Sequence, residues 1–365
     1  MNKYAKKITF ALLALMMIGV TTYAQFTTTF SKNATPGQQN GLYYSLPLTM
    51  LQLDFTIQET VYEKGPLSDY ADRYFENEDY VDYNATEYKL LNLEMSSKAA
   101  PDPNATFFVT FTVVRGSGKP VFDVLPNGII RSVGTRGAKD KEEVVECQSE
   151  VHLVETPAAS KTPLENQVFL PLLTAGKTNA QLAKEVADKI EEIRKDKYFL
   201  IRGDVETASD PETFKAMYAK LDELEQEYLS LFLGKRVTRQ IVRTVNVIPD
   251  KETTSLTVAK FSETDGLTIG ANGSGRDIMV QIEPLGMIAS INAPSQSAIE
   301  LMTYENKVIY RIPEKANVKV SYSGRVLVEN CQTINQLGLL LMAPLMDSKL
   351  VFDTETGQVV NLRMR

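Results

Sequence analysis

Residues 178–233 carry the one sustained helical pattern in the chain, and this limits the folds open to the remainder. Thr178 is placed to cap a helix that runs to about Tyr198. Asp210-Pro211-Glu212 then supplies a cap, a first-turn proline and an acid, which predicts a second helix to about Phe232. The apolar stripes of the two helices are Leu182, Val186, Ile190 and Ile193, then Phe214, Met217, Leu221, Leu224, Tyr228 and Leu231. Because few residues separate the helices, we expect an antiparallel two-helix hairpin.

The stripe of the second helix, from Phe214 to Leu231, has the narrow spacing of a coiled-coil seam. An amphipathic helix usually packs such a stripe on an adjoining sheet, which is the first interpretation. The second interpretation is that the stripe offers a docking face to a partner protein. The sequence leaves both open.

Alternating apolar segments separated by turn residues lie on both sides of the hairpin, and they predict β-strands. The expected strands are 48–62, 88–94, 107–114, 121–125, 129–133, 144–154, 241–248, 255–261, 277–282, 308–312, 318–322, 325–328, 350–352 and 359–362. A short helix is expected over 69–75, a break at Pro101-Asp102-Pro103-Asn104, and a tight hairpin at Ser323-Gly324. The fold class is therefore α+β, with β-rich N- and C-terminal regions and a central two-helix antiparallel hairpin.

The length of the chain indicates more than one domain. Without residues 1–24 about 340 residues remain, which exceeds a usual single core at ~150 residues per domain. We predict a flexible leader at 25–41, an N-terminal β-rich domain at 42–140, and a C-terminal α+β domain at 141–365 that contains the hairpin at about 178–233.

Two turns resemble one another. Phe122-Asp123 followed by Gly128 is echoed by Phe352-Asp353 followed by Gly357. Hairpins of this kind recur by chance and the two spacings differ by one residue, so we infer no duplicated halves from the echo.

The first 24 residues follow the pattern of a secretory signal peptide. Lys3, Lys6 and Lys7 precede the apolar run Ile8–Val20, which is shorter than the ~20 residues of a spanning helix. Thr22-Tyr23-Ala24 matches the small-residue cleavage pattern, and no cysteine follows it to carry a lipid. We therefore expect export, cleavage after Ala24, and a soluble mature chain without direct membrane insertion, either periplasmic or associated with the outer membrane.

Charge narrows the choice of partner. Loss of the three N-terminal lysines moves the formal net charge from −7 to −10. Nucleic acids and anionic membranes both favour basic patches, so neither is expected as a partner. A protein partner in the cell envelope is expected instead.

The chain has two cysteines, Cys147 and Cys331, and one histidine, His152. The cysteines form either one disulfide or two unpaired, buried thiols. A metal site of the Cys/His type needs three or four ligands, so we assign no metal site. His152 falls on the polar face of the 144–154 segment and Cys147 on the opposite face, which predicts an exposed histidine rather than a Cys–His pair. The polar face is Glu146, Gln148, Glu150 and His152, and the other face is Val145, Cys147, Ser149, Val151 and Leu153.

Two further segments have the composition of a possible ligand-binding site. Gly270–Arg276 is rich in glycine but lacks the Lys-Ser/Thr of a phosphate loop and a following helix, so we interpret it as a flexible loop. The segment Asp69–Tyr88 carries five tyrosines and seven acids, which could bind a sugar or pack a small helix on the sheet. Packing is favoured because tyrosine is commonly half-buried. We assign no catalytic residue and no cofactor-binding residue.

Several segments in order along the chain share a pattern. They are Gly41-Leu42-Tyr43-Tyr44-Ser45-Leu46-Pro47, Gly65-Pro66, Tyr70-Ala71, Tyr74, Glu225, Tyr228, Leu231-Phe232, Gly234-Lys235, Tyr310-Arg311-Ile312-Pro313, Gln336-Leu337-Gly338 and Phe352-Asp353 with Gly357. Together they resemble an uncharacterised family of exported Bacteroidetes proteins, domain of unknown function 4831. The resemblance implies an envelope setting and one architecture of β-rich ends around a helical insert. It brings no activity and no site residues, and Phe75-Glu76 stands where a glycine stop is expected.

Two functions follow as hypotheses. The first is a non-enzymatic envelope protein that binds or scaffolds another envelope component. The alternative is a glycan- or peptide-directed hydrolase that uses paired carboxylates. Two acids facing each other ~5–10 Å apart in a deep pocket would favour the hydrolase. An exposed apolar surface or a free edge strand would favour the binding protein.

Overall fold

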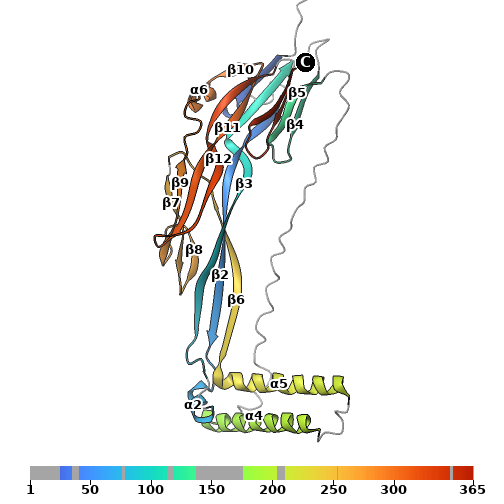
Figure 1. Cartoon of the computed structure of the whole chain (residues 1–365), viewed down its shortest axis with the longest axis vertical. Helices are drawn as coiled ribbons and strands as arrows, with labels where there is room; N and C mark the ends of the chain where they lie inside the picture. The colour runs from blue at the N-terminus through green and yellow to red at the C-terminus, as the bar shows by residue number, and fades with distance from the viewer. Residues whose placement is uncertain are drawn as a thin grey trace, which may run out of the picture.

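The structure, a computed structural model, describes residues 25–34, 41–75, 79–112, 119–136, 176–203, 210–252, 254–345 and 348–364. The molecule is elongated, with β-sheets at one end and a pair of long helices at the other (Figure 1). The predicted class is confirmed, because the chain is β-rich on both sides of a central helix pair.

Three antiparallel sheets form the β-rich end. The first has the order β10-β1-β3-β2-β6, with β1 (Gln25–Phe30), β2 (Gly41–Glu63), β3 (Ala85–Thr112), β6 (Lys235–Val247) and β10 (Thr303–Glu305). The second has the order β12-β11-β9-β7-β8, with β7 (Ser255–Ser262), β8 (Gly266–Ile269), β9 (Arg276–Pro284), β11 (Lys307–Tyr322) and β12 (Arg325–Pro344). The third has the order β14-β13-β5-β4, with β4 (Lys119–Val124), β5 (Ile130–Arg136), β13 (Ser348–Phe352) and β14 (Val359–Met364). The first and third sheets combine strands from both sides of residue 140, so a boundary there does not separate the sheets.

The expected flexible leader is wrong for its first residues. Gln25–Phe30 forms β1, which pairs with β3 and β10. The reason is burial, since Phe26 and Phe30 alternate with polar residues and enter the core beside Phe107. Three threonines stand between the two phenylalanines, so the sequence of this strand is mostly polar and was predicted as a leader.

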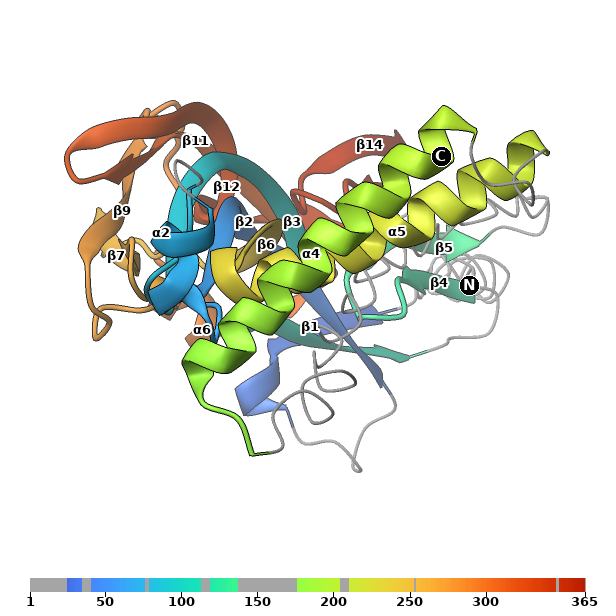
Figure 2. The same ribbon diagram turned by 90° about the horizontal axis from the view of Figure 1, so that it is seen from below.

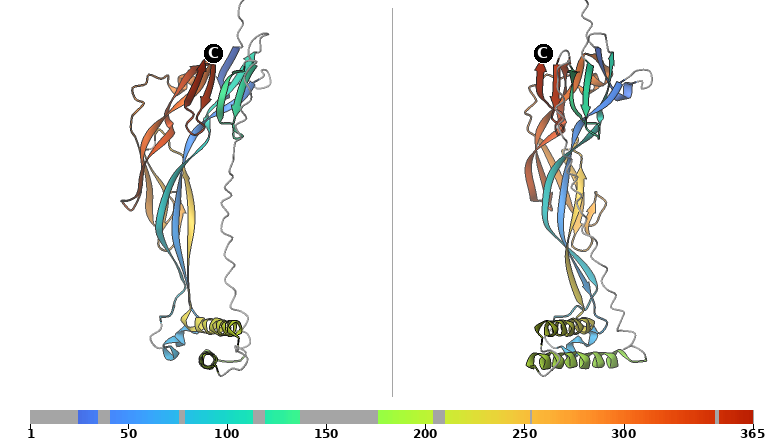
Figure 3. Two further views of the ribbon diagram at one scale, coloured as in Figure 1. Left: turned by 45° about the vertical axis from the view of Figure 1, so that its right-hand side comes forward. Right: turned by 90° about the vertical axis from the view of Figure 1, so that its right-hand side faces the viewer.

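A long ribbon joins the two ends of the molecule. In the middle of β2 the buried side chains Leu51, Leu53, Phe55 and Ile57 pack on the second sheet. Beyond Ile57 the strands β2, β3 and β6 continue together to the helices (Figures 1 and 3). The second sheet still contacts the ribbon at Tyr88, whose N–H donates to the Glu263 carbonyl at 2.8 Å, and it ends before the helices. Most β6 side chains between residues 236 and 244 are exposed as a result. The ribbon therefore holds the helices away from the β core.

The expected break at Pro101-Asp102-Pro103-Asn104 is wrong, because β3 continues through it as one strand. Ser45 pairs with Thr106 and Pro47 pairs with Pro101, so the four residues Asp102–Ala105 lie opposite the single residue Leu46. A bulge accommodates proline because the extra residues are not required to donate to the ladder.

The second long hairpin contains the same irregularity. The two strands expected at 308–312 and 318–322 are one strand, β11, interrupted by a bulge at Pro313. The four residues Asn335–Gly338 of β12 lie opposite Pro313, between the pairs Ile312–Leu339 and Glu314–Ile334. The sequence pattern did not predict the strand over residues 329–344.

The two long hairpins resemble each other in a further way. Each precedes a short hairpin, β4–β5 or β13–β14, and these lie side by side in the third sheet. The turn carbonyl of Gly128 accepts a bond of 2.9 Å from the Ser45 N–H, and that of Gly357 accepts one of 3.1 Å from the Arg311 N–H. The echo between the Phe122 and Phe352 turns therefore extends over both hairpins and their bulges, which argues against a chance match.

Both predicted long helices are present, with the caps that the sequence indicates. Thr178 and Gln181 form a capping box at the start of the first helix, and Asp210 accepts from the Thr213 N–H at the start of the second. The first helix runs one turn further than expected, to Gly203 at φ 78°. The helical segments are η1 (Ser31–Asn33), η2 (Ser68–Tyr70), α2 (Ala71–Tyr74), α4 (Asn179–Arg202), α5 (Pro211–Leu233) and α6 (Gln296–Leu301).

The stripes of α4 and α5 do not pack on a sheet. They pack on each other and on the η2–α2 segment, through Leu67, Ala71 and Phe75 (Figure 2). The first interpretation of the stripes is therefore wrong, since the helices lie past the end of the sheet. Among the described residues, no helix combines the length and the apolar character that crossing a membrane requires.

Candidate functional site

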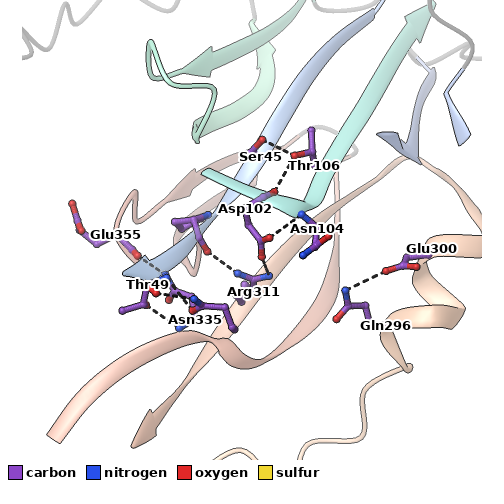
Figure 4. A network of polar contacts seen from close by, with 12 residues as sticks. Ser45, Thr49, Asp102, Asn104, Thr106, Gln296, Glu300, Arg311, Asn335 and Glu355 are labelled. Carbon is purple, nitrogen blue, oxygen red and sulfur yellow. Dashed lines mark hydrogen bonds and ion pairs between the residues drawn. The ribbon is translucent and has the colours of Figure 1, made fainter. Parts of the chain in front are cut away.

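A buried ion pair joins the two long hairpins at their bulges (Figure 4). Arg311 on β11 donates from Nη2 to the Asp102 carboxylate at 2.7 Å and from Nη1 to the Pro47 carbonyl at 2.6 Å. The second carboxylate oxygen of Asp102 accepts from the Asn104 N–H at 2.9 Å. Arg311 and Asp102 are each only 5% exposed. These charges are engaged with one another, which is the arrangement of a structural contact rather than of a reactive group.

A second group of bonds closes the other bulge. The Thr49 N–H donates to Gln336 Oε1 at 2.9 Å, and Gln336 Nε2 donates back to the Thr49 carbonyl at 2.7 Å. The Asn335 N–H donates to Thr49 Oγ1, and Asn335 Nδ2 donates to the Glu355 carbonyl (Figure 4). Bulge residues leave the strand ladder, so these side chains supply the partners that their backbone groups need.

A row of polar side chains crosses the ribbon below the core. Glu59 on β2 pairs in register with Tyr88 on β3 and with Arg239 on β6. Hydrogen bonding from Arg239 holds the pKa of Glu59 below the ordinary value of 4.5, although burial opposes this. Burial, helped by the hydrogen bond to Glu59, raises the pKa of Tyr88. The hydrogen bonds that Arg239 and Tyr88 donate in this row therefore favour the ionised form of Glu59.

This row predicts a loss of stability in acid. Because the pKa of Glu59 is lowered on folding, its contribution is present above the unfolded-state value and is lost as pH falls through the folded-state value. We expect Glu59→Gln to reduce the pH dependence of the free energy of unfolding between about pH 5 and pH 3. Urea denaturation at several pH values measures it. Equal pH dependence in both proteins would contradict the assignment.

A cleft of about 810 Å³ lies between the ribbon and the β11–β12 turn. The ribbon contributes mostly polar side chains to its lining, and β12 contributes Val326 and Leu327. Glu87 and Glu263 both line the cleft, and Glu87 accepts a hydrogen bond from Tyr62 that raises the pKa of the tyrosine. The cleft is partly open to solvent.

A cluster of charges centred on the buried side chains of Lys197 and Glu225 joins the two long helices. Lys197 on α4 donates to Asp222 and to Glu225 on α5, at 2.7 Å in each case. Arg194 donates to the other oxygen of Glu225 at 2.6 Å. Burial acts to raise the pKa of Glu225, but the bonds from Lys197 and Arg194 outweigh it and leave the pKa lowered. The antiparallel arrangement and its register follow from these pairs.

Beyond this cluster the hairpin ends in exposed apolar side chains. Tyr198 is 57% exposed, Phe199 44% and Ile201 61%. Tyr198 and Ile201 are one turn apart and share a face of α4. We call these three residues the apolar tip. Sequence reasoning missed it, because the first helix was expected to end at about Tyr198, whereas α4 continues to Arg202.

The other residues singled out from the sequence lie apart from the tip. Cys331 is an exposed, unpaired cysteine on β12, so the expectation of a buried thiol is wrong for it. Glu329 and Asn330, which precede it on β12, are exposed as well. Cys147, His152 and the 144–154 segment lie outside the described residues, as does the 1–24 signal pattern.

The structure shows the conformation of the two segments that the sequence offered as candidate binding sites. Gly270–Arg276 connects β8 to β9 with no helix after it, and Ser274 donates to Asp265 at 2.5 Å across the turn. Tyr70, Tyr74 and Tyr80 pack against the buried cluster of the helices, so the expected packing of the short helix on the sheet is wrong. Within the described ranges, no three His, Cys, Asp or Glu side chains gather as a metal-binding group.

A comparison with models of known protein families identifies the family of the chain. A model described as Domain of unknown function (DUF4831) matches residues 40–360. The chain belongs to this family. The DUF4831 match runs from β2 to β14 and so includes both long hairpins and the helices. No curated protein and no solved structure matches the chain.

Proposed function

We propose that this DUF4831 protein is a non-enzymatic envelope protein that binds or scaffolds another envelope component through its helical hairpin. The observation that carries the proposal is the apolar tip, the exposed side chains of Tyr198, Phe199 and Ile201 on α4. Figure 1 shows α4 at the end of the molecule opposite the β core. Large apolar side chains gathered on a surface commonly mark a contact with another macromolecule. Aromatic residues are also enriched among those that dominate binding energy.

The dimensions of the molecule support a role in spanning a distance. β2 has 23 residues, which at about 3.3 Å each extend over about 75 Å. Paired strands on both sides stiffen this length, and the Lys197–Glu225 ion pair holds the two antiparallel helices together. A rigid arm of this kind can hold its tip at a fixed distance from whatever the β core contacts.

The proposed location is the periplasm, or the outer membrane with which the chain would be associated as a soluble protein. It is supported by the signal pattern over residues 1–24 and by the acidic composition. The proposal has the mature chain held at the envelope by its protein partner, with neither a lipid nor a spanning helix of its own.

We predict that a partner protein binds this chain and that its binding requires the apolar tip. We expect the full chain, cross-linked in cells and purified from the solubilised envelope, to carry one protein at constant stoichiometry. The variant Tyr198→Ser with Phe199→Ser and Ile201→Ser should reduce the recovered partner at least tenfold, because three buried apolar contacts of the complex are lost. Mass spectrometry of the purified complex measures the ratio.

The control changes apolar residues of similar exposure elsewhere. Leu256→Ser with Ile269→Ser alters β7 and β8 on the β core and should leave the recovery unchanged. Circular dichroism should show the same helix content in all three proteins. Absence of the chain from the envelope fraction, its recovery alone, or a partner retained by the tip variant would each refute the proposal.

A further inference from the structure

The outer edge of β6 is not paired with any other described strand. β6 pairs with β2 on one side and ends the first sheet, as the outer strand of the ribbon (Figure 1). Edge strands are commonly short, charged, covered, or broken by a bulge or a proline, because their unpaired N–H and C=O groups accept further strands. β6 has 13 residues, pairs with β2 without a register shift and contains no proline. Charge is therefore the one protective feature that β6 itself carries.

Side chains do not cover this edge among the described residues. Eight of the nine residues 236–244 are exposed, and Ile241 is the exception. Successive residues of a strand point to opposite faces, so both faces of the ribbon are open along this stretch. At about 3.3 Å a residue, the open stretch is about 30 Å long, which is the length of a complete added strand.

The contacts of the ribbon show which backbone groups of β6 point outward. The Tyr88 N–H on β3 donates to the Glu263 carbonyl, so it points away from β2. Glu59 lies directly opposite Tyr88, so its own N–H and C=O also point away from β3, toward Arg239 of β6. Arg239 therefore exchanges its backbone bonds with Glu59. The residues at even positions from 236 to 244 present their N–H and C=O groups outward.

The strand is basic, although the chain as a whole is acidic. Residues 235–247 include four basic residues and no acid, whereas the formal net charge of the chain is −7. Arg239 and Arg243 flank Ile241 on one face of β6. Arg239 is bonded to Glu59, yet 59% of its side chain is exposed. Arg243 is exposed and forms no ion pair with a described residue, so its charge is available to an incoming strand.

These charges favour one kind of added strand. A second copy of β6 that paired antiparallel around Ile241 would place Arg239 opposite Arg243, and like charges directly opposite each other are destabilising. A strand with two acids four residues apart would instead place one acid opposite each arginine, which is stabilising. On the other face Val242 is 63% exposed, which favours a β-branched residue between the two acids.

We propose that the outer edge of β6 binds an extended acidic segment of a partner protein, which adds to the first sheet as a further strand. In this mode of recognition the backbone bonds supply affinity and the side chains supply selectivity. Here the outward groups of β6 bind the backbone of the segment, and Arg239 and Arg243 select its acids. The edge is separate from the apolar tip, so this inference does not rest on the proposed function.

A synthetic peptide tests the pairing. The probe is fluorescein-labelled Thr-Val-Glu-Val-Thr-Val-Glu-Val-Thr, titrated with the full chain and followed by fluorescence anisotropy. We expect saturable binding, about tenfold weaker for the peptide with lysine in place of both glutamates. Val242→Pro removes a central outward N–H at a position where an edge strand tolerates proline, and it should weaken binding about tenfold. Val242→Thr keeps this N–H and should bind as the wild type does.

A charge reversal tests the selectivity. Arg243→Glu should weaken binding of the acidic peptide about 5–10-fold and strengthen binding of the lysine peptide, because the charge pair is exchanged. The matched control is Lys89→Glu, which changes an exposed cation on β3, at the other edge of the ribbon, and should alter neither affinity. The apolar-tip variant should bind the acidic peptide as tightly as the wild type, which separates this test from that of the proposed function.

Three results would overturn the proposal. The first is no binding of the acidic peptide to the wild-type chain. The second is equal binding of an acidic peptide with proline at alternate positions, since charge alone would then attract the peptide without strand pairing. The third is a dimer of the chain, detected by analytical ultracentrifugation, that excludes the peptide and is lost in Val242→Pro, because a second copy would then occupy the edge.

Discussion

Asp102→Asn is expected to lower the free energy of unfolding by about 3–5 kcal/mol, because it leaves a charged arginine buried without its counter-ion. Arg311 donates to Asp102 at 2.7 Å from a position that is almost fully buried. Asparagine keeps the shape of the side chain and can still accept one hydrogen bond, so the loss reports mainly the missing charge. Urea denaturation followed by tyrosine fluorescence measures it.

Two further variants separate this explanation from a general disturbance of the bulge. Asp102→Leu combined with Arg311→Met removes both charges, and it should recover much of the lost stability because apolar residues replace the pair. Glu223→Gln breaks the exposed Lys220–Glu223 pair and should cost less than about 1 kcal/mol. A loss below 1 kcal/mol in Asp102→Asn would show that the pair does not hold the hairpins together.

The same contact explains where sequence reasoning failed. Pro101-Asp102-Pro103-Asn104 has the chemistry of a turn, and nothing local distinguishes a turn from a four-residue bulge. The difference is made by Arg311, which is 209 residues away and has no pattern that points to Asp102. Residues 308–322 were likewise predicted as two strands separated near Pro313, although β11 is continuous and the four-residue bulge lies opposite Pro313 on β12.

The helical hairpin was predictable because its signals are local. Thr178, Asp210 and Gly234 mark its ends, and the apolar period fixes its faces. The packing of those faces was not predictable, since the sequence does not show that the sheet ends before the helices. The tip illustrates the limit: within Tyr198-Phe199-Leu200-Ile201 only Leu200 is buried, and a run of four apolar residues resembles core.

The exposed surface of β6 was also not predictable, because it too depends on parts of the chain that are distant in sequence. The alternation that exposes β6 on both faces depends on the ribbon continuing past the second sheet, which arises from the exceptional lengths of β2 and β3. The sequence predicted only the parts of those strands with clear apolar alternation. Residues 95–106 of β3, which no expected strand covers, are almost all polar, small or proline, and they give no periodic signal.

Phe232→Ala is expected to destabilise the helical hairpin by about 3–5 kcal/mol while leaving the β core unchanged. Phe232 is fully buried, and its ring centroid lies 5.0 Å from that of Phe75 and 5.9 Å from that of Tyr74. These rings join the last turn of α5 to the η2–α2 segment. Helical and β residues belong to separate buried clusters, so the cavity should loosen the hairpin alone.

Hydrogen exchange read by mass spectrometry distinguishes the two parts. Peptides from α4 and α5 should exchange faster in Phe232→Ala, while peptides from β9 and β11 should keep wild-type rates. Phe199→Ala serves as the matched control, because its ring is 44% exposed and its loss should cost less than about 1 kcal/mol. Equal acceleration in helices and strands would mean that the molecule unfolds as one unit. If the hairpin alone loosens, capture of the partner should fall with it, whereas the apolar-tip variant should lose capture with its helices intact.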